Sequence, residues 1–265
     1  MQLIDRIFGA RCRYCRSRGV TDIGPVAPTH PASFHTKSFA LQHCRNCDVV
    51  YLSPLPTSAD LKLLYEDSAQ FTDDHYTDPA QVEKILDYYG SAVRNLGLAP
   101  EPGGRMLEIG AGLAWVSRAC KAVDPDIFTL AQDVSSECAK ICPWVDRYFV
   151  GSLDALPDNA PYQMISLTHV LEHLVDPGAV LKKIGSLLAP GGRIFITAPF
   201  RPTGWQPGAG IDAWLRYSYL HVPAHVTYFS RQWFERAGHA NGLIVASWDN
   251  THEDDQAFEL VLRKA

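Results

Sequence analysis

Alternating apolar strands and amphipathic helices between residues 105 and 198 constrain the fold of this chain most strongly. Short apolar runs predict strands, and apolar residues at helical spacing predict the helices between them. The strands are expected at 105–110, 127–132, 146–150, 162–168 and 192–198, and the helices at 113–123, 135–142 and 177–188. Because strand and helix alternate at this pitch, the strands should run parallel, with crossover helices on both faces.

The C-terminal end departs from this rhythm. Residues 199–225 are rich in Pro, Gly and Trp and show no period, and a helix is expected near 230–241. Strands at 243–248 and 257–263 follow, and the short polar turn between them predicts an antiparallel hairpin. The expected fold class is α/β, a Rossmann-like doubly wound sheet of seven strands that ends in this hairpin.

Composition narrows the classes of protein. The chain has 265 residues, of which 46% are hydrophobic and 20% charged, so it folds as a globular protein. No apolar run approaches the ~20 residues that cross a bilayer, and Asp5 and Arg6 stand where a signal peptide would be apolar. We therefore expect a cytoplasmic protein without a membrane partner.

Small residues mark the turn from the first of these strands into its helix. In Glu108-Ile109-Gly110-Ala111-Gly112 the last three residues are small, and only small residues let a ligand approach that backbone and the helix N-terminus closely. The dinucleotide fingerprint places a third glycine where this chain has Trp115, which argues against a nicotinamide or flavin cofactor. Glu108 would repel a pyrophosphate but favour a cationic ligand such as a sulfonium.

A second acid, Asp133, ends the next strand about 20 residues further on. From there a carboxylate accepts hydrogen bonds from both hydroxyls of a ribose. The same residue also suits the N-cap of a helix ahead of Ser135. A sulfonium and a ribose occur together in S-adenosylmethionine, so the two acids predict this cofactor.

Five stretches carry a resemblance to a known family. They are, in chain order, residues 107–112, 132–135, 151–157, 168–177 and 188–193. Together they resemble class I S-adenosylmethionine-dependent methyltransferases. The resemblance implies that Glu108, Gly110 and Gly112 line the methionine and ribose side of the cofactor. It further implies cofactor contacts for six residues. Asp133 would contact the ribose with Val134 beside it, Leu153 with its neighbour Ser152 would contact the adenine, and Thr168 with His169 would edge the transfer site. Ala114 and Ser152 depart from the family pattern.

The segment His169-Val170-Leu171-Glu172-His173 also matches the His-x-x-Glu-His motif of one group of zinc peptidases. That motif needs one continuous helix, so that both histidines meet the ion. Here the strand is expected to end at His169, and Asp176-Pro177 follows soon after. A peptidase is therefore disfavoured, and Glu172 with His173 is expected to form a tight turn beside the pocket.

Two Cys-x-x-Cys knuckles lie near the N-terminus, Cys12 with Cys15 and Cys44 with Cys47. Four such thiolates are the ligand set of a closed, structural zinc site, and an odd total of seven cysteines argues against a disulfide scaffold. A redox pair is the rival interpretation. The alternative ligands from histidine are His30, His35 and His43.

The chain is expected to divide at the Pro-Leu-Pro step near residue 55. We predict a zinc-ribbon module at 1–57, a helical bridge and cofactor lid at 58–100, and the S-adenosylmethionine-binding domain at 101–265. The bridge should hold two helices, at 58–67 and about 79–96. This order resembles a methyltransferase subgroup of sugar and natural-product pathways.

Methyl transfer needs positioning and, where the acceptor must lose a proton, a base. In the sugar C-methyltransferases of that subgroup a Glu-His pair supplies the base, and this chain keeps His225 but has Ala224 in place of the Glu. We predict His225 as the base, with His169 as the second candidate.

The predicted function is methyl transfer to carbon or oxygen of a small molecule, with zinc as a structural ion. One alternative is an RNA methyltransferase, because residues 1–57 carry seven Lys and Arg against three Asp. Another is a non-catalytic zinc-ribbon adaptor. We expect a small-molecule partner rather than nucleic acid, and the sequence does not determine the oligomeric state.

Overall fold

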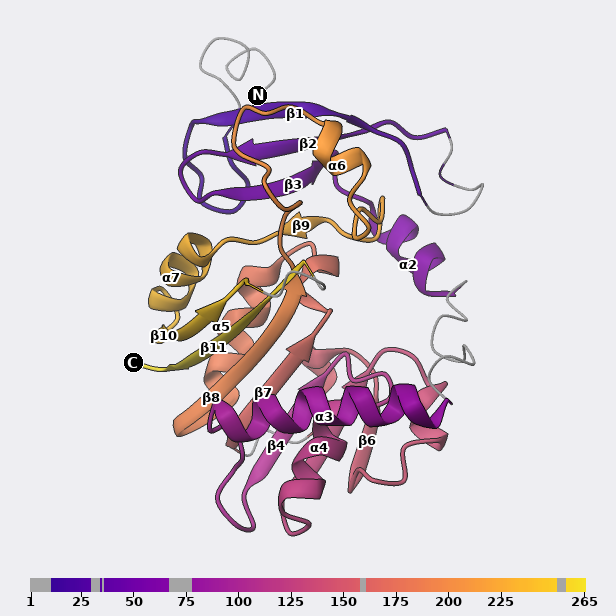
Figure 1. Cartoon of the computed structure of the whole chain (residues 1–265), viewed down its shortest axis with the longest axis vertical. Coiled ribbons are helices and arrows are strands. Elements are labelled where there is room, and N and C mark those ends of the chain that lie inside the picture. The colour runs from indigo at the N-terminus through magenta and orange to yellow at the C-terminus, as the bar shows by residue number, and fades with distance from the viewer. Residues whose placement is uncertain (1–10, 30–33, 35, 67–77, 158–160, 252–255) are drawn as a thin grey trace.

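Seven strands form one mixed sheet in the order β10-β11-β8-β7-β4-β5-β6 (Figure 1). The computed structural model describes residues 11–29, 34, 36–66, 78–157, 161–251 and 256–265. The strands are β4 (Arg105–Ile109), β5 (Phe128–Asp133), β6 (Arg147–Val150), β7 (Tyr162–Thr168), β8 (Leu188–Pro199), β10 (Leu243–Asp249) and β11 (Ala257–Lys264). β6, β5, β4, β7 and β8 run parallel, whereas β11 pairs antiparallel with β8 and β10. The predicted fold class is confirmed.

Helices cover both faces of this sheet. They are α3 (Pro79–Asn95), α4 (Trp115–Val123), α5 (Pro177–Leu187) and α7 (Arg231–His239). Successive strand residues point to opposite faces, so Met106 packs with Val116 of α4, whereas Leu107 belongs to the cluster with Leu181 of α5. Caps fix where the helices begin: Asp176 accepts from the N–H of Ala179, and Ser230 from that of Trp233.

A second, smaller sheet lies beyond the carboxyl ends of the parallel strands (Figure 1). Its antiparallel order is β1-β2-β3-β9. The strands are β1 (Val20–Val26), β2 (Phe39–Cys44), β3 (Val49–Ser53) and β9 (Thr227–Tyr228). β9 comes from the C-terminal part of the chain and pairs with β3, which the sequence did not predict. The division at residues 57 and 100 stays a prediction.

The irregular segment 199–225 covers one side of this small sheet. It contains only a short helix, α6 (Asp212–Leu215). Trp214 is fully buried and stacks edge-on against Tyr228 of β9 and Trp205. Helix α2 (Ser58–Glu66) follows β3 as predicted. The aromatic side chains of the segment therefore form the core between it and the small sheet.

The helix expected at 135–142 is absent, and the prediction was wrong. The structure has a single 3-10 turn there, η4 (Cys138–Lys140). The carboxylate of Asp133 accepts from the N–H of Ser135, which holds the backbone in a local turn, and Pro143 cannot continue a helix. Two further 3-10 turns are η5 (Leu153–Ala155) and η6 (Leu171–His173). Across the described ranges, every helix is too short or too polar to cross a membrane.

Candidate active site and metal centre

Glu108 fastens the start of α4 to the end of β4. Its carboxylate is 1% exposed and accepts from the N–H and the hydroxyl of Ser117, both at 2.7 Å, and from the N–H of Val116 at 3.2 Å. Burial raises the pKa of Glu108 to about 7, against the lowering effect of these hydrogen bonds. Both oxygens are turned to the helix N-terminus, so Glu108 acts on a ligand through the backbone that it positions.

The protonation of Glu108 should make stability depend on pH. Its folded pKa lies above the ordinary 4.5, so the stability that it contributes is complete below pH 4.5 and is lost as the pH rises through 7. The loss should be about 3 kcal/mol. Urea unfolding of the wild type and of Glu108→Gln between pH 4.5 and 8 measures it. Parallel pH profiles of the two proteins would contradict the raised pKa.

Gly110 adopts a left-handed backbone conformation beside the loop that follows β7. Its φ is +59°, and a Cβ there would lie 2.4 Å from Cγ2 of Val170. The loop thus needs glycine for close packing against the chain itself, in addition to any ligand.

Gly110→Ala should therefore destabilise the fold by about 2 to 5 kcal/mol, from backbone strain and overpacking together. Gly191→Ala is the matched control, because Gly191 also has a positive φ but no atom lies within 4 Å of its Cβ position. Chemical denaturation of both variants gives the difference. Adding Val170→Ala to Gly110→Ala should recover the overpacking part, and no recovery would assign the loss to the backbone alone.

Asp133 holds the glycine loop from the neighbouring strand. One carboxylate oxygen accepts from the N–H of Gly112 at 2.9 Å, and the other accepts from the N–H of Ser135 at 2.9 Å. The hydroxyl of Tyr148 donates to the carbonyl of Gly112 at 2.8 Å. Val134, the next residue, is 59% exposed, which is unusual for a large apolar side chain at a strand end. The loop is therefore fixed on both sides, with an apolar side chain open beside it.

The other predicted cofactor residues follow neighbouring strands of the same edge. Ser152 is exposed and precedes η5, and Leu153 is half-buried within that turn. Thr168 is the last residue of β7, and His169 follows it. Since β7, β4, β5 and β6 are adjacent and parallel, their carboxyl ends form one row. Ligands of open α/β sheets bind at this edge.

His169 lies over a buried carboxylate. Its backbone is left-handed, with φ +54°, and its ring stacks on Tyr219 at 5.9 Å between centroids. The Nδ1 atom is 3.5 Å from Oε1 of Glu172, and the His169 side chain is 39% exposed. Burial raises the pKa of Glu172, but His169, His173 and His225 together lower it by more. The pKa of Glu172 therefore lies below its ordinary value.

His225 is placed differently from His169. It is 7% exposed, and its Nδ1 donates to the carbonyl of Tyr219 at 2.8 Å. Burial, with the charge of His173, lowers the pKa of His225 to about 3. The ring is therefore neutral near pH 7 and weakly basic. The stretch 169–173 holds only η6 and no continuous helix, as expected when the peptidase motif was set aside.

The four cysteines of the two knuckles converge on one point. Sγ of Cys12 is 3.7 Å from that of Cys47, and Sγ of Cys15 is 3.6 Å from that of Cys44. All four sulfurs lie within 4.8 Å of one another. Zinc–sulfur bonds of about 2.3 Å in a tetrahedron place the sulfurs about 3.8 Å apart, whereas a disulfide needs about 2.0 Å. The cluster thus fits a zinc ribbon.

The two knuckles share one backbone geometry. The N–H of Arg16 donates to the carbonyl of Cys12 at 2.9 Å, and the N–H of Asp48 to that of Cys44 at 2.8 Å. Arg16 and Asp48 both have left-handed φ, of 61° and 52°. This repeated turn aims both thiols of each pair inward.

Acid–base properties of the cluster also suit a metal. A hydrogen bond from the thiol of Cys47 lowers the pKa of Cys12 to about 5, and the same contact raises the pKa of Cys47. The thiolate is the form that binds metals. His43 instead bonds Asp48 at 2.8 Å, and the other two histidines considered as ligands, His30 and His35, lie outside the described residues.

A family model described as a methyltransferase domain matches residues 82–247. This chain belongs to that methyltransferase family. Membership implies an enzyme that uses S-adenosylmethionine, and the matched region contains the row of strand ends described above.

Curated relatives match the methyltransferase over shorter stretches. Methyltransferase str2 from Strobilurus tenacellus is 40% identical over 95 residues, which are 35% of this chain and 34% of the relative. A ubiquinone biosynthesis O-methyltransferase from Xylella fastidiosa is 29% identical over 121 residues, 42% of this chain and 46% of the relative. The chain thus spans less than half of the length of these relatives.

Two solved structures share the fold of the methyltransferase. The mitomycin 7-O-methyltransferase MmcR has a TM-score of 0.52 at 16% identity and covers 75% of this chain and 62% of that chain. Coclaurine N-methyltransferase, bound to N-methylheliamine and SAH, has a TM-score of 0.53 at 12% identity and covers 76% and 80%. At these identities the likeness establishes the fold alone.

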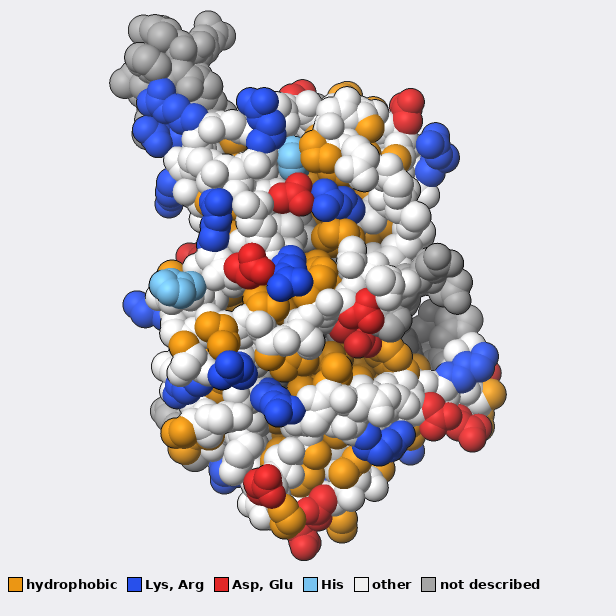
Figure 2. Space-filling view, turned by 60° about the vertical axis from the view of Figure 1, so that its left-hand side comes forward, with side chains coloured by type: hydrophobic (Ala, Val, Ile, Leu, Met, Phe, Trp, Pro, Cys, Tyr) orange, Lys and Arg blue, Asp and Glu red, His pale blue; other side chains and the backbone are white. Residues whose placement is uncertain are grey.

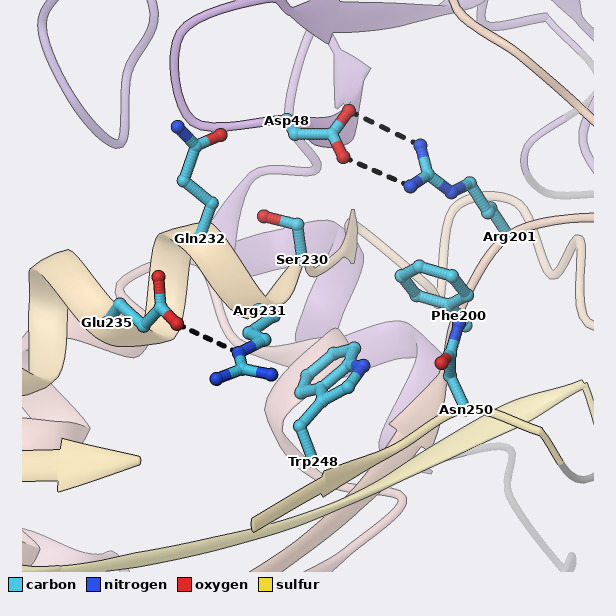
Figure 3. A pocket seen from close by; sticks show the side chains of 9 residues that line it. All are labelled: Asp48, Phe200, Arg201, Ser230, Arg231, Gln232, Glu235, Trp248 and Asn250. Carbon is cyan, nitrogen blue, oxygen red and sulfur yellow. Dashed lines mark hydrogen bonds and ion pairs between the residues drawn. The ribbon is translucent and has the colours of Figure 1, made fainter. Parts of the chain in front are cut away.

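A pocket of about 340 Å³ lies elsewhere on the methyltransferase, between the turn of the small sheet that holds Asp48, α7 and β10 (Figure 3). Its two arginines are already paired: Arg201 with Asp48 at 3.0 Å and Arg231 with Glu235 at 2.8 Å. Trp248 lines its lower side (Figure 3). Because both arginines are paired within the chain, we do not assign the cofactor site to this pocket.

Proposed function

We propose that this methyltransferase transfers a methyl group to oxygen or carbon of a small molecule, in sugar or natural-product biosynthesis. The observation that carries the proposal is the braced glycine loop between β4 and α4, with Asp133 beside it at the carboxyl edge of the sheet. Several similar proteins are O-methyltransferases, which favours oxygen as the acceptor atom.

The residues at this edge fit S-adenosylmethionine. Gly110 and Gly112 keep side chains away from the loop backbone, and Asp133 offers a carboxylate to the ribose. The open Val134 suits the face of the adenine, with Ser152 and Leu153 on the next strand end. When bound, the cofactor supplies a sulfonium methyl group to the acceptor. Thr168 and His169 border the acceptor side.

We propose His169 as the base, oriented by Glu172. A carboxylate next to Nδ1 favours the tautomer in which Nε2 carries the lone pair, and His169 is exposed where an acceptor can reach it. The sequence favoured His225 as the base, and that role stays a prediction. Its burial and its pKa of about 3 make His225 a poor proton acceptor.

The cysteine cluster is proposed to hold a structural zinc ion. Its four ligands close the coordination sphere, so the ion stabilises the small sheet rather than reacting. β9 joins that sheet and also neighbours η6, so an intact zinc site should position the acceptor side of the enzyme.

A small-molecule acceptor is proposed rather than RNA. On the face shown in Figure 2, Lys and Arg side chains are dispersed among acidic and apolar ones and do not form a continuous stripe. A phosphate backbone is held by clustered cations. Salt-dependent retention of RNA by the full chain would favour the RNA methyltransferase instead.

Calorimetry with S-adenosylmethionine and S-adenosylhomocysteine tests the cofactor assignment without a substrate. Micromolar binding of either supports it, whereas absence of binding by both would favour a non-catalytic adaptor. A panel of hydroxylated metabolites, screened for release of S-adenosylhomocysteine, then tests the acceptor.

With an acceptor identified, His169→Asn should lower kcat by about 100-fold, since a positioned base contributes about that much or more. Binding of S-adenosylhomocysteine should stay unchanged. His239→Asn, an exposed histidine on α7, is the control and should leave kcat intact. An unchanged kcat in His169→Asn would return the role to another group.

A further inference from the structure

A buried carboxylate and two histidines lie close together after β7, near the proposed acceptor site at Thr168 and His169. They are separate from the glycine loop and from the cysteine cluster. Glu172 and His173 belong to η6, and His225 precedes β9. One ligand atom of each lies within 4.8 Å of the others. The N–H of Val226 donates to the carbonyl of Glu172 at 2.8 Å, which ties the two segments together.

The carboxylate of Glu172 is buried without a hydrogen bond, although two histidines stand at ion-pair distance. It is 0% exposed, and among the described residues neither of its oxygens accepts a hydrogen bond. The ring nitrogens of His169 and His173 stand 3.5 and 4.0 Å from Oε1. A buried charge is retained in proteins when it is paired or coordinates a metal, so a cation would complete this cluster.

Both histidines are held as metal ligands usually are. Nδ1 of His173 donates to the carbonyl of Ala224 at 3.0 Å, and Nδ1 of His225 donates to that of Tyr219 at 2.8 Å. Such a bond fixes the tautomer, so Nε2 of each ring carries the lone pair. Metal-binding histidines are oriented by outer hydrogen bonds of this kind.

We propose that Glu172, His173 and His225 bind a divalent transition-metal ion, with zinc as the best match. Two imidazoles and one carboxylate are a known ligand set of catalytic zinc sites. Zinc would hold these atoms about 3.4 Å apart, so side-chain shifts of roughly 1 Å close the site. Three protein ligands leave one position open for water or for an oxygen atom of a substrate.

The open coordination position would have a role in methyl transfer, and this role rests on the proposed function. An oxygen bound to such an ion loses its proton at a lower pH. The acceptor would then be a hydroxyl group, in an alcohol, phenol or enol, that binds the ion beside the exposed ring of His169. His169 would take the hydroxyl proton, and the oxygen would bond to the methyl carbon as the bond from that carbon to sulfur breaks.

Counting metal ions tests the site without any acceptor. The full chain, stripped with a chelator and reloaded with cobalt(II), should bind two ions, one with thiolate-to-cobalt absorption and one without. His173→Ala/His225→Ala should bind one ion and keep the thiolate absorption unchanged. His239→Ala, which removes an exposed histidine of α7, should bind two.

A single thiolate-bound ion in the wild type would overturn the site, and so would a second ion retained by the double variant. Binding of S-adenosylhomocysteine reports whether the double variant is folded. If it is not, the isosteric Glu172→Gln gives the same readout, with at least a tenfold weaker second ion expected. Failure of methyl transfer would not change the ion count, so the two proposals fail separately.

Discussion

Replacing Cys12 and Cys44 together by serine should abolish thiolate-bound metal and unfold the small sheet. Each knuckle then loses one thiolate, and the two remaining sulfurs cannot close a tetrahedral site. Structural zinc contributes about 10 to 16 kcal/mol in small zinc domains, as much as the whole stability of a typical domain.

Metal content and thermal unfolding measure this effect. The double variant should lose the thiolate-to-cobalt absorption and a separate unfolding transition, and a strong chelator should do the same to the wild type. Cys138→Ala is the control, because Cys138 is buried in η4 outside the cluster. Unchanged absorption in the double variant would mean that the thiolates do not hold the ion.

Replacing Asp133 by alanine should weaken binding of S-adenosylhomocysteine by about 100-fold. Hydrogen bonds to a charged group contribute about 1.5 to 3 kcal/mol each. Asp133 makes two to the backbone, at Gly112 and Ser135, and in the proposed complex it accepts from the ribose as well. The variant loses both the loop brace and the ribose acceptor.

Calorimetry of Asp133→Ala and Asp133→Asn separates the two contributions. The asparagine keeps one acceptor oxygen and the shape of the side chain, so it should bind with intermediate affinity. Asp154→Ala is the control, since Asp154 is an exposed acid of η5 near the same edge. Equal affinity of wild type and Asp133→Ala would remove the ribose assignment but leave the family membership untouched.

Local patterning was enough for the large sheet. The strand at 162–168 and the helix at 79–96 follow from periodicity, and the structure adds that Asp78 caps α3 and Asp176 caps α5. The helix predicted at 135–142 does not form. Its helical spacing of apolar residues competes with the hydrogen bond from the N–H of Ser135 to Asp133, which favours a turn. The outcome depends on Asp133 at the end of β5, and the helical spacing of the following residues does not reveal its effect.

The functional site was predictable in part. Glycines and acids at strand ends predicted the row that the structure forms, because parallel strands bring their carboxyl ends to one edge. The role of Glu108 was not predictable, since its contacts with Val116 and Ser117 depend on how α4 packs. Periodicity and motifs likewise could not show that His225 lies in a buried cluster with Glu172 and His173.

By itself, the sequence determined the strand and helix order, the glycine loop and the two cysteine knuckles, because these depend on local periodicity and on residues a few positions apart. Only the tertiary structure decided that β9 completes the small sheet and that His225 meets Glu172, which lies 53 positions earlier in the chain. Such contacts depend on burial and on the packing of distant segments. The glycine loop is the proposed cofactor site, and the geometry around Glu172 distinguishes an exposed histidine, His169, from a buried one, His225.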